Sequence, residues 1–347
     1  MVGVDLPSLN NFRDLSAVTL AHGHFIRPNL LLRGASPLDL STRDVSTLVS
    51  RVGLRTVLDL RSEEEAGKDT GARSLQAHAA VRTKHVNLLD AELIRGGAIR
   101  KLLAMPHYCA MLAALWLVRA ITRSIPSVPR TLRVRAASAF EARVTRLLTS
   151  VELVDVYWWV LLRRGSRLRE ALEMCADPKA TPLLVHCTHG KDRTGVFVAM
   201  LLHICGANVE AIADDYSRSD AWGKSKEGRA LMGAALPSRL RRNKRAMHTW
   251  CAASTDSILG LWERIEKRFG SVDNYLDRIG VTCEMRAAIA MAVVGEGRGG
   301  GRSGRMTWTH LGGSELREYV RESEYIIVRG RESARAREIE RRREIEA

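Results

Sequence analysis

The apolar and polar positions of residues 181–205 follow one another as a strand, a loop and a helix would. The segment TPLLVHC (181–187) runs through four consecutive apolar residues, which is typical of a parallel strand buried on both faces. The polar residues THGKDR (188–193) come next. TGVFVAMLLHIC (194–205) is then apolar nearly all round, as in a helix packed in the interior. The pattern predicts that a buried strand delivers Cys187 to a polar loop at the start of a buried helix.

Short apolar runs and amphipathic stretches also alternate elsewhere along the chain. TVLDL (56–60) predicts a strand, and STRDVSTLVSRVG (41–53) before it predicts a helix with Ser41 or Thr42 as the N-cap and Gly53 as its terminator. DSILGLWERIEKRFG (256–270) predicts an amphipathic helix that ends at its glycine. Strands that alternate with helices indicate an α/β fold, with a central, mostly parallel sheet flanked by helices.

Residues 95–170 have a different composition, with 14 Lys and Arg against 4 Asp and Glu. They contain LLAMPHYCAMLAALWLV (102–118), 17 residues without a formal charge, which is a borderline length for crossing a bilayer. A buried helix or a helix at a membrane surface is the other interpretation. We expect residues 95–170 to be a basic, mainly helical insertion in a domain that covers residues 1–294.

The segment 295–347 is predicted to lie outside that domain. GEGRGGGRSGR (295–305) has the composition of a flexible linker, and RESARAREIERRREIEA (331–347) predicts a charged helix with Glu and Arg at helical spacing. Residues 298–347 hold 12 Arg and 9 Glu, so this tail is only weakly basic. We expect a solvated helical appendage and no nucleic-acid partner.

Composition and charge narrow the class of protein. A hydrophobic content of 46% is ordinary for a globular chain, whereas the net charge of +15 favours acidic partners such as phosphorylated proteins or inositol lipids. The first 15 residues have no basic region followed by an apolar run, so we expect no signal peptide and a cytoplasmic location. The cysteines lack zinc-ligand spacing and are predicted to be reduced thiols: Cys109, Cys175, Cys187, Cys205, Cys251 and Cys283.

The residues after the apolar strand are suited to binding a phosphate. A loop between a strand end and a helix N-terminus can turn its backbone N–H groups inward, and Gly190 suits the tight turn. Arg193 can bind two phosphate oxygens, and such a site favours the thiolate of Cys187, which could attack phosphorus and form a phosphocysteine. Thr194 can donate its hydroxyl to the sulfur, and His186 is expected to order the loop.

HCTHGKDRTG (186–195) resembles the C-x5-R signature of cysteine-based protein tyrosine and dual-specificity phosphatases. Within that family it is most similar to the branch whose loop reads HCxxGKDRTG. Four further segments are similar to segments of that branch: NNFRDL (10–15), the stretch from LLRGAS to RSEEE (31–65), IADDYSRSD (212–220) and IEKRFGSVDNYLDRIGV (265–281).

The resemblance implies a tyrosine-phosphatase-like fold and hydrolysis of phosphate monoesters without a metal or other cofactor. In this branch the aspartate inside the loop, here Asp192, is the expected general acid, and Asp155 is the second candidate. The substrate-binding residues implied are Thr188, His189, Gly190, Lys191 and Thr194. Lys191 would add a fixed positive charge, which goes with phosphoinositide substrates in relatives.

The amino-terminal motif has two interpretations. In the relatives it lies near the mouth of the active site, so Asn11, Arg13 and Asp14 either shape that mouth or form a structural turn. Asp59, Arg61 and Asp215 are predicted to stabilise the fold.

Three functions remain open on the sequence. The first is a phosphatase acting on phosphotyrosine-like monoesters of proteins or on phosphoinositides, with possible peripheral membrane contact. The second is a phosphate-binding adaptor without catalysis, although such proteins usually lose the cysteine or the arginine. The third is rhodanese or arsenate-reductase chemistry, against which His186 and the R-T-G after the loop both argue.

Overall fold

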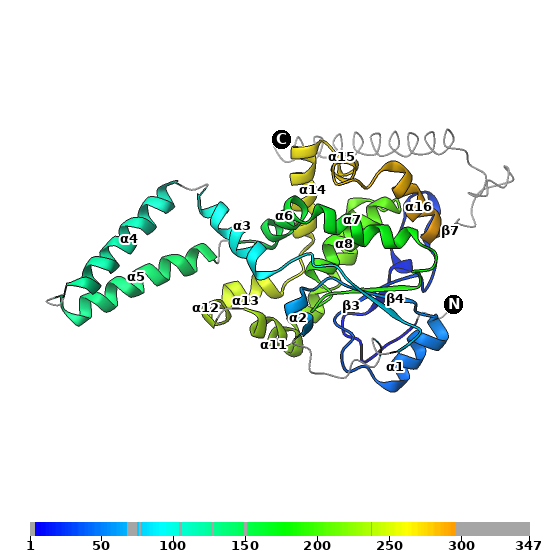
Figure 1. The fold of residues 1–347 in the computed structure, drawn as a ribbon, viewed down its shortest axis with the longest axis horizontal. Helices are drawn as coiled ribbons and strands as arrows, with labels where there is room; N and C mark the ends of the chain where they lie inside the picture. Colours follow the sequence, from blue (N-terminus) through cyan, green and yellow to red (C-terminus); the bar gives the residue numbers. More distant parts are fainter. Residues whose placement is uncertain are drawn as a thin grey trace, which may run out of the picture.

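The computed structural model describes residues 4–67, 75, 78–103, 106–125, 128–148, 151–236 and 238–295 (Figure 1). The strands of this part are β1 (Arg13–Asp14), β2 (Phe25–Ile26), β3 (Leu31–Gly34), β4 (Thr56–Asp59), β5 (Arg82–His85), β6 (Leu183–His186) and β7 (Val294–Gly295). The α-helices are α1 (Thr42–Ser46), α2 (Glu63–Gly67), α3 (Ala91–Leu103), α4 (Pro106–Ser124), α5 (Arg130–Leu148), α6 (Leu153–Arg163), α7 (Gly165–Glu173), α8 (Asp192–Ile204), α9 (Val209–Ser217), α10 (Asp220–Lys224), α11 (Lys226–Ala235), α12 (Ser238–Arg241), α13 (Lys244–Cys251), α14 (Thr255–Phe269), α15 (Val272–Arg278) and α16 (Cys283–Val293). Shorter helical turns are η1 (Leu15–Ala17), η2 (Ala21–Gly23), η3 (Thr47–Val52) and η4 (Met174–Ala176).

The central sheet of the described residues has the strand order β1-β3-β6-β4-β5. β3, β6, β4 and β5 are parallel, and β1 is antiparallel to β3 at one edge. In this register Leu184 of β6 pairs with Leu32 of β3 on one side and with Val57 of β4 on the other. The carboxyl ends of β3, β4 and β6 therefore meet at one edge of the sheet. This confirms the predicted α/β class with a mostly parallel sheet.

The two faces of the sheet contribute to two apolar clusters, because alternate residues of a strand point to opposite faces. On one face Leu58 and Val185 join the larger cluster, which includes the interior of α6, α8, α9 and α14. On the other face Val57 and Leu184 join a smaller cluster with Leu48 of η3 and the amino-terminal segment. In Figure 1 most helices lie on the first face and α1 on the second. β6 is thus buried on both faces, as its continuous apolar run predicted.

Several predicted boundaries are confirmed with their physical reasons. Ser41 caps α1 by accepting a hydrogen bond from the backbone N–H of Asp44. Gly53, at a φ of 71°, ends η3, the π-helical turn that continues α1. β4 begins at Thr56, the first residue of the predicted strand TVLDL. Gly270, at a φ of 83°, follows the last residue of α14.

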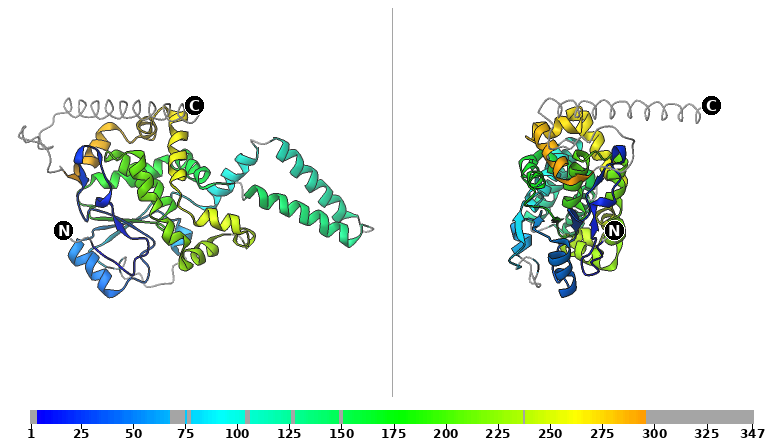
Figure 2. Two further views of the ribbon diagram at one scale, coloured as in Figure 1. Left: turned by 180° about the vertical axis from the view of Figure 1, so that it is seen from behind. Right: turned by 90° about the vertical axis from the view of Figure 1, so that its right-hand side faces the viewer.

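The basic insertion is helical where it is described, but its parts differ in where they pack. α4 and α5 run side by side as a hairpin that projects from the body, most clearly in the rear view of Figure 2. α6 and the first part of α7 fall inside the predicted range 95–170 and yet belong to the core, since Val156 and Leu168 are completely buried. The projecting part is therefore 106–148, narrower than the insertion predicted from composition.

None of the helices in the described part of the chain is long and apolar enough to cross a membrane. The predicted linker at 295–305, beyond Gly295, and the predicted charged helix at 331–347 lie outside the described residues.

Candidate active site

Residues 187–193 form the loop between β6 and α8 at the carboxyl edge of the parallel strands. Cys187 begins this loop and is 2% exposed. α8 begins at Asp192, so the positive end of its dipole faces the loop. Gly190 has a φ of 65°, and a Cβ at this position would lie 2.2 Å from the carbonyl oxygen of Gly34. Only glycine fits this turn, because both the backbone conformation and the close approach to β3 exclude a side chain.

The outward-facing carbonyl groups of the loop are held by two side chains from distant parts of the sequence. Asn11 donates its amide to the carbonyl oxygens of His189 and Gly190 at 3.0 and 3.1 Å. Arg33 of β3 donates to the carbonyl oxygen of Gly190 at 2.9 Å. In a trans peptide the N–H points opposite to the C=O, so the amides of Gly190 and Lys191 turn toward the inside of the loop. The result is a set of backbone donors suited to an anion.

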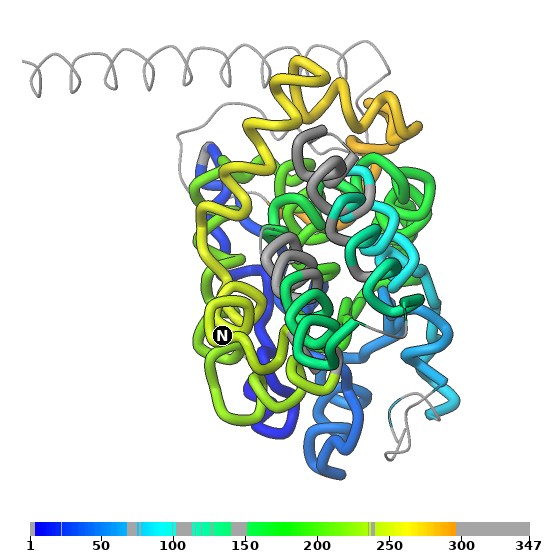
Figure 3. The backbone as a smooth tube through the Cα atoms, turned by 90° about the vertical axis from the view of Figure 1, so that its left-hand side faces the viewer, coloured from blue at the N-terminus to red at the C-terminus, as the bar shows by residue number. Residues whose placement is uncertain are grey.

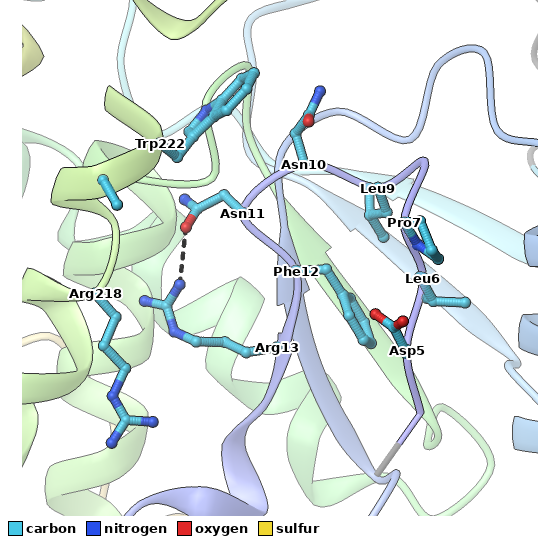
Figure 4. Close-up of a pocket in the computed structure, with 11 residues that line it drawn as sticks. Asp5, Leu6, Pro7, Leu9, Asn10, Asn11, Phe12, Arg13, Arg218 and Trp222 are labelled. Atoms are coloured by element: carbon cyan, nitrogen blue, oxygen red, sulfur yellow. Dashed lines mark hydrogen bonds between the residues drawn. The ribbon is translucent and has the colours of Figure 1, made fainter. Parts of the chain in front are cut away.

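Asn11 is itself positioned by a buried charge network, part of which is drawn in Figure 4. Arg13 donates to the side-chain oxygen of Asn11 at 2.9 Å. Arg13 and Arg33 also contact the carboxylate of Asp215 in α9, at 2.7 and 2.5 Å. Although burial opposes it, the two arginines hold the pKa of Asp215 below its usual value. Removing the carboxylate of Asp215 would leave the charges of two buried arginines uncompensated, at a cost of about 3–5 kcal/mol.

Asp14, the last charged residue of the NNFRDL motif, has a different place. Its carboxylate accepts the backbone N–H groups of Ser16 and Asn29 at 2.9 and 2.7 Å. Of the three motif residues singled out in the sequence, Asn11 and Arg13 belong to the network behind the loop, and Asp14 forms a turn.

A cavity lies beside this motif and is lined by Phe12, Arg13, Arg218 and Trp222 among other residues (Figure 4). Cys187 is not one of its lining residues. The cavity is thus a neighbour of the loop and shares Asn11 with it.

The guanidinium of Arg193 has a fixed orientation because Glu65 of α2 binds it with both carboxylate oxygens. Nη2 lies 2.9 Å from Oε1, and Nη1 contacts Oε2. Thr188 accepts from Nη2 at 3.2 Å and donates to Glu65 at 3.1 Å. Burial opposes ionisation, but the hydrogen bond and charge of Arg193 lower the pKa of Glu65 to about 2. Burial also works against charging Arg193, yet Glu65 and Cys187 raise its pKa, so the pair stays ionised.

Two buried donors at the start of α8 have no hydrogen-bond partner among the described residues. They are Nε of Arg193 and the hydroxyl of Thr194. An unsatisfied buried polar group costs about 1–3 kcal/mol, which an incoming phosphate oxygen or the cysteine sulfur can recover. The bond from Thr194 to the sulfur that the sequence led us to expect is not formed in this structure.

Asp192 lies at the rim of the loop and is held by a tyrosine pair. The hydroxyl of Tyr157 in α6 donates to Oδ1 of Asp192 at 2.6 Å, and the Tyr216 hydroxyl of α9 lies 2.6 Å from that of Tyr157. Burial and the charge of Asp192 raise the pKa of Tyr157 well above its ordinary value, so it remains a phenol that donates. With Oδ1 occupied, Oδ2 is the oxygen of Asp192 available to a substrate. No sequence pattern indicates this pair, because both tyrosines occupy apolar helix faces.

Lys191 is placed differently from what the sequence led us to expect. Its ammonium donates to the carbonyl oxygens of Trp250 and Ala252 at 2.6 and 2.9 Å and lies 3.5 Å from Oδ1 of Asp192. The two carbonyl groups engage two of its three N–H donors, and the contact with Asp192 is an ion pair. Lys191 thus connects the loop to the end of α13. The residue is 1% exposed, so its positive charge is buried.

Asp155, the second candidate for the general acid, is part of the start of α6. Its carboxylate accepts the backbone N–H of Glu152 at 3.0 Å and pairs with Lys101 and Arg264. Although burial opposes it, these partners hold the pKa of Asp155 below its usual value. A carboxylate stabilised in this way is a poor proton donor near neutral pH.

The two histidines of the loop region are neutral. Burial lowers the pKa of His186 and that of His189 to about 4. Nδ1 of His186 lies 3.2 Å from the carbonyl oxygen of Cys187, and its Nε2 lies 3.8 Å from Asp59, which pairs with Arg61 at 2.8 Å. Nε2 has no hydrogen-bond partner among the described residues, so His186 contacts the backbone at the start of the loop and does not supply charge.

Comparison with known proteins identifies the family of this chain. It matches the tyrosine phosphatase family over residues 4–294 and therefore belongs to that family. The triple specificity protein phosphatase PtpB of Mycobacterium tuberculosis is 25% identical over 290 residues, covering 80% of this chain and 94% of PtpB. The inositol diphosphatase DSP2 of Arabidopsis thaliana is 40% identical over 70 residues, covering 20% of this chain and 24% of DSP2.

Among solved structures, the core catalytic domain of the PP-IP phosphatase SIW14 from S. cerevisiae aligns with a TM-score of 0.29 and 15% identity, covering 78% of this chain and 98% of that domain. The family match confirms the membership of the cysteine-based tyrosine and dual-specificity phosphatases that the sequence predicted. The chain is thus a cysteine-based phosphoric monoester hydrolase of the protein-tyrosine-phosphatase type.

Proposed function

We propose that this enzyme hydrolyses phosphotyrosine-like monoesters of proteins through a phosphocysteine on Cys187. The observation that carries this assignment is the loop itself. Cys187 lies at the start of a loop in which Asn11 and Arg33 hold carbonyl groups outward. Nε of Arg193 is buried and has no hydrogen-bond partner among the described residues. That arrangement fits one tetrahedral dianion in front of one sulfur.

In the first step the sulfur of Cys187 donates the electron pair that forms the S–P bond while the P–O bond to the leaving group breaks. The backbone amides and Arg193 hold the remaining phosphoryl oxygens. Glu65 supports this step by keeping the guanidinium in one orientation, so little reorganisation is needed as charge develops. Oδ2 of protonated Asp192 gives its proton to the leaving oxygen.

In the second step water attacks phosphorus, the S–P bond breaks, and its electron pair returns to the sulfur. Asp192, now a carboxylate, takes the proton of the attacking water. The hydroxyl of Thr194, which has no hydrogen-bond partner among the described residues, can donate to the departing thiolate. Tyr157 and Lys191 keep Asp192 in place through both steps.

A phosphoinositide is the alternative substrate for the same site. The net charge of +15 favours an acidic substrate or surface, and DSP2, similar over a short segment, is an inositol diphosphatase. Such a substrate would bring the enzyme into peripheral contact with a membrane. A phosphate-binding adaptor is disfavoured because both Cys187 and Arg193 are present.

The same reasoning extends to the organisation of the chain. We propose residues 1–294 as the catalytic domain and 295–347 as a linker and tail outside it; the family match, which ends at residue 294, supports this boundary. A cytoplasmic location suits an enzyme that depends on a reduced thiol, and the cysteines of the described part are free.

A parallel phosphate-release assay tests the function. We expect release from a phosphotyrosine peptide well above that from a matched phosphoserine peptide, with phosphatidylinositol phosphates as the third substrate and the Cys187→Ser protein as blank. Release from the lipid at a higher kcat/KM than from the peptide would assign the alternative. No release above the blank from any of the three would contradict the proposal.

A further inference from the structure

The helical hairpin formed by α4 and α5 extends away from the catalytic body. The two helices pack on each other, α3 contacts α4, α12 contacts α5, and the far end of the pair projects away from the body (Figures 1 and 2). Figure 3, which looks at the hairpin end on, shows the pair in front of the body. The hairpin contributes little to the core, so stabilising the catalytic body does not explain its presence.

The described part of the hairpin carries a concentration of exposed apolar side chains. Of the twelve large apolar side chains exposed in the described residues, seven belong to it, and Trp116 is 60% exposed. The seven are Trp116, Leu117, Val118, Ile121, Ile125, Leu132 and Val134. Single exposed apolar residues are normal, but such a gathering on one projecting element marks an interaction surface.

The charge of the same element selects the kind of partner. Residues 106–148 contain seven Arg, no Lys and one Glu, Glu141. Apolar side chains with a tryptophan beside arginines are the composition of helices that lie in the interface of an anionic bilayer. Two copies of the hairpin would bring like charges together, which disfavours self-association.

The hairpin also leaves the body on the side where substrates arrive. The parallel strands end at the 187–193 loop, and α2 and α3 follow β4 and β5 at that same edge. α3 leads directly into α4, and Figure 1 shows α2 and the hairpin toward the same side of the sheet. A bilayer bound by the hairpin would thus lie toward the edge that carries Cys187.

We propose that the α4–α5 hairpin is a membrane-docking element that binds an anionic bilayer surface without crossing it. The docking depends only on the hairpin. Its use, bringing phosphoinositide headgroups to Cys187, rests on the proposed catalysis by Cys187 and on the alternative substrate given above.

Vesicle co-sedimentation of the full chain tests this proposal. We compare phosphatidylcholine vesicles with vesicles that also contain phosphatidylserine, and the wild type with the triple variant Trp116→Ser, Leu117→Ser, Ile121→Ser. A matched control replaces three exposed apolar residues elsewhere: Leu231→Ser, Leu259→Ser and Met291→Ser. We expect the wild type and the control to bind the anionic vesicles, and the hairpin variant to bind more than about tenfold more weakly.

Turnover of soluble para-nitrophenyl phosphate by all three proteins reports whether each is folded and separates docking from catalysis. Equal turnover with selective loss of vesicle binding supports the proposal. Vesicle binding without turnover in the wild type would overturn the proposed catalysis and leave the docking intact. Three outcomes would overturn the docking. The wild type could stay in the supernatant, or the hairpin variant could bind as well as the control. Light scattering could also show that the wild type and the control are dimers and that only the hairpin variant is a monomer.

Discussion

Replacing Cys187 with serine is expected to lower kcat by about 10⁴-fold or more while phosphotyrosine peptides still bind. A serine hydroxyl at neutral pH is a far weaker nucleophile than a thiolate, whereas the amides of the loop and the Arg193–Glu65 pair do not depend on the sulfur. Turnover is measured with para-nitrophenyl phosphate and binding by calorimetry with a phosphotyrosine peptide.

Cys283→Ser is the matched control, because Cys283 is a free thiol in α16, away from the loop. It should retain wild-type kcat. If Cys187→Ser kept turnover near that of the control, the nucleophile would have to be another group.

Replacing Asp192 with asparagine is expected to slow phenyl phosphate by about 10²- to 10⁴-fold and para-nitrophenyl phosphate much less. Phenolate is a poor leaving group that needs a proton as the P–O bond breaks, while para-nitrophenolate leaves without one. Asparagine retains the shape of the side chain and can still accept from Tyr157, so the orientation is preserved and only the proton is lost. The measurement is the kcat/KM of both esters.

Asp155→Asn is the control for this experiment. It weakens the contacts of Asp155 with Lys101 and Arg264, so it should lower the Tm, yet it should affect the two esters equally. Equal slowing of the two esters by Asp192→Asn would show that Asp192 only orders the loop. A selective effect of Asp155→Asn would move the general acid to that residue.

The features that the sequence predicted well are those determined by local patterns. The apolar run before Cys187 predicts a strand buried on both faces, and Leu184 and Val185 do face opposite apolar clusters. Ser41 and Gly53 mark the limits of a helical segment because capping and left-handed termination involve only neighbouring residues. The loop itself is also local, since C-x5-R requires only that a strand precede it and a helix follow it.

The features that could not be predicted join residues far apart along the chain. Asn11 reaches the carbonyl of Gly190, and Glu65 reaches Arg193 across 128 positions. Tyr157 reaches Asp192 from a helix that composition assigned to an insertion. Each is an ordinary polar or aromatic residue in its own segment, and only the fold reveals its partner.

Lys191 illustrates the opposite difficulty. Its position in the loop suggested a phosphate ligand, but the carbonyl groups of Trp250 and Ala252 engage its ammonium. The sequence shows which charges are near the site, and the structure determines which donors remain available.

The most direct test of this account is to trap the enzyme during turnover and locate the phosphate. The Asp192→Asn variant with para-nitrophenyl phosphate suits this purpose, because its first step needs no proton and its second step loses the group that activates water. Samples quenched in acid are digested and analysed by mass spectrometry. The account predicts one added PO3 group on the peptide containing Cys187 and on that sulfur. Unmodified Cys187 during ongoing phosphate release, or phosphate on a different residue, would contradict it.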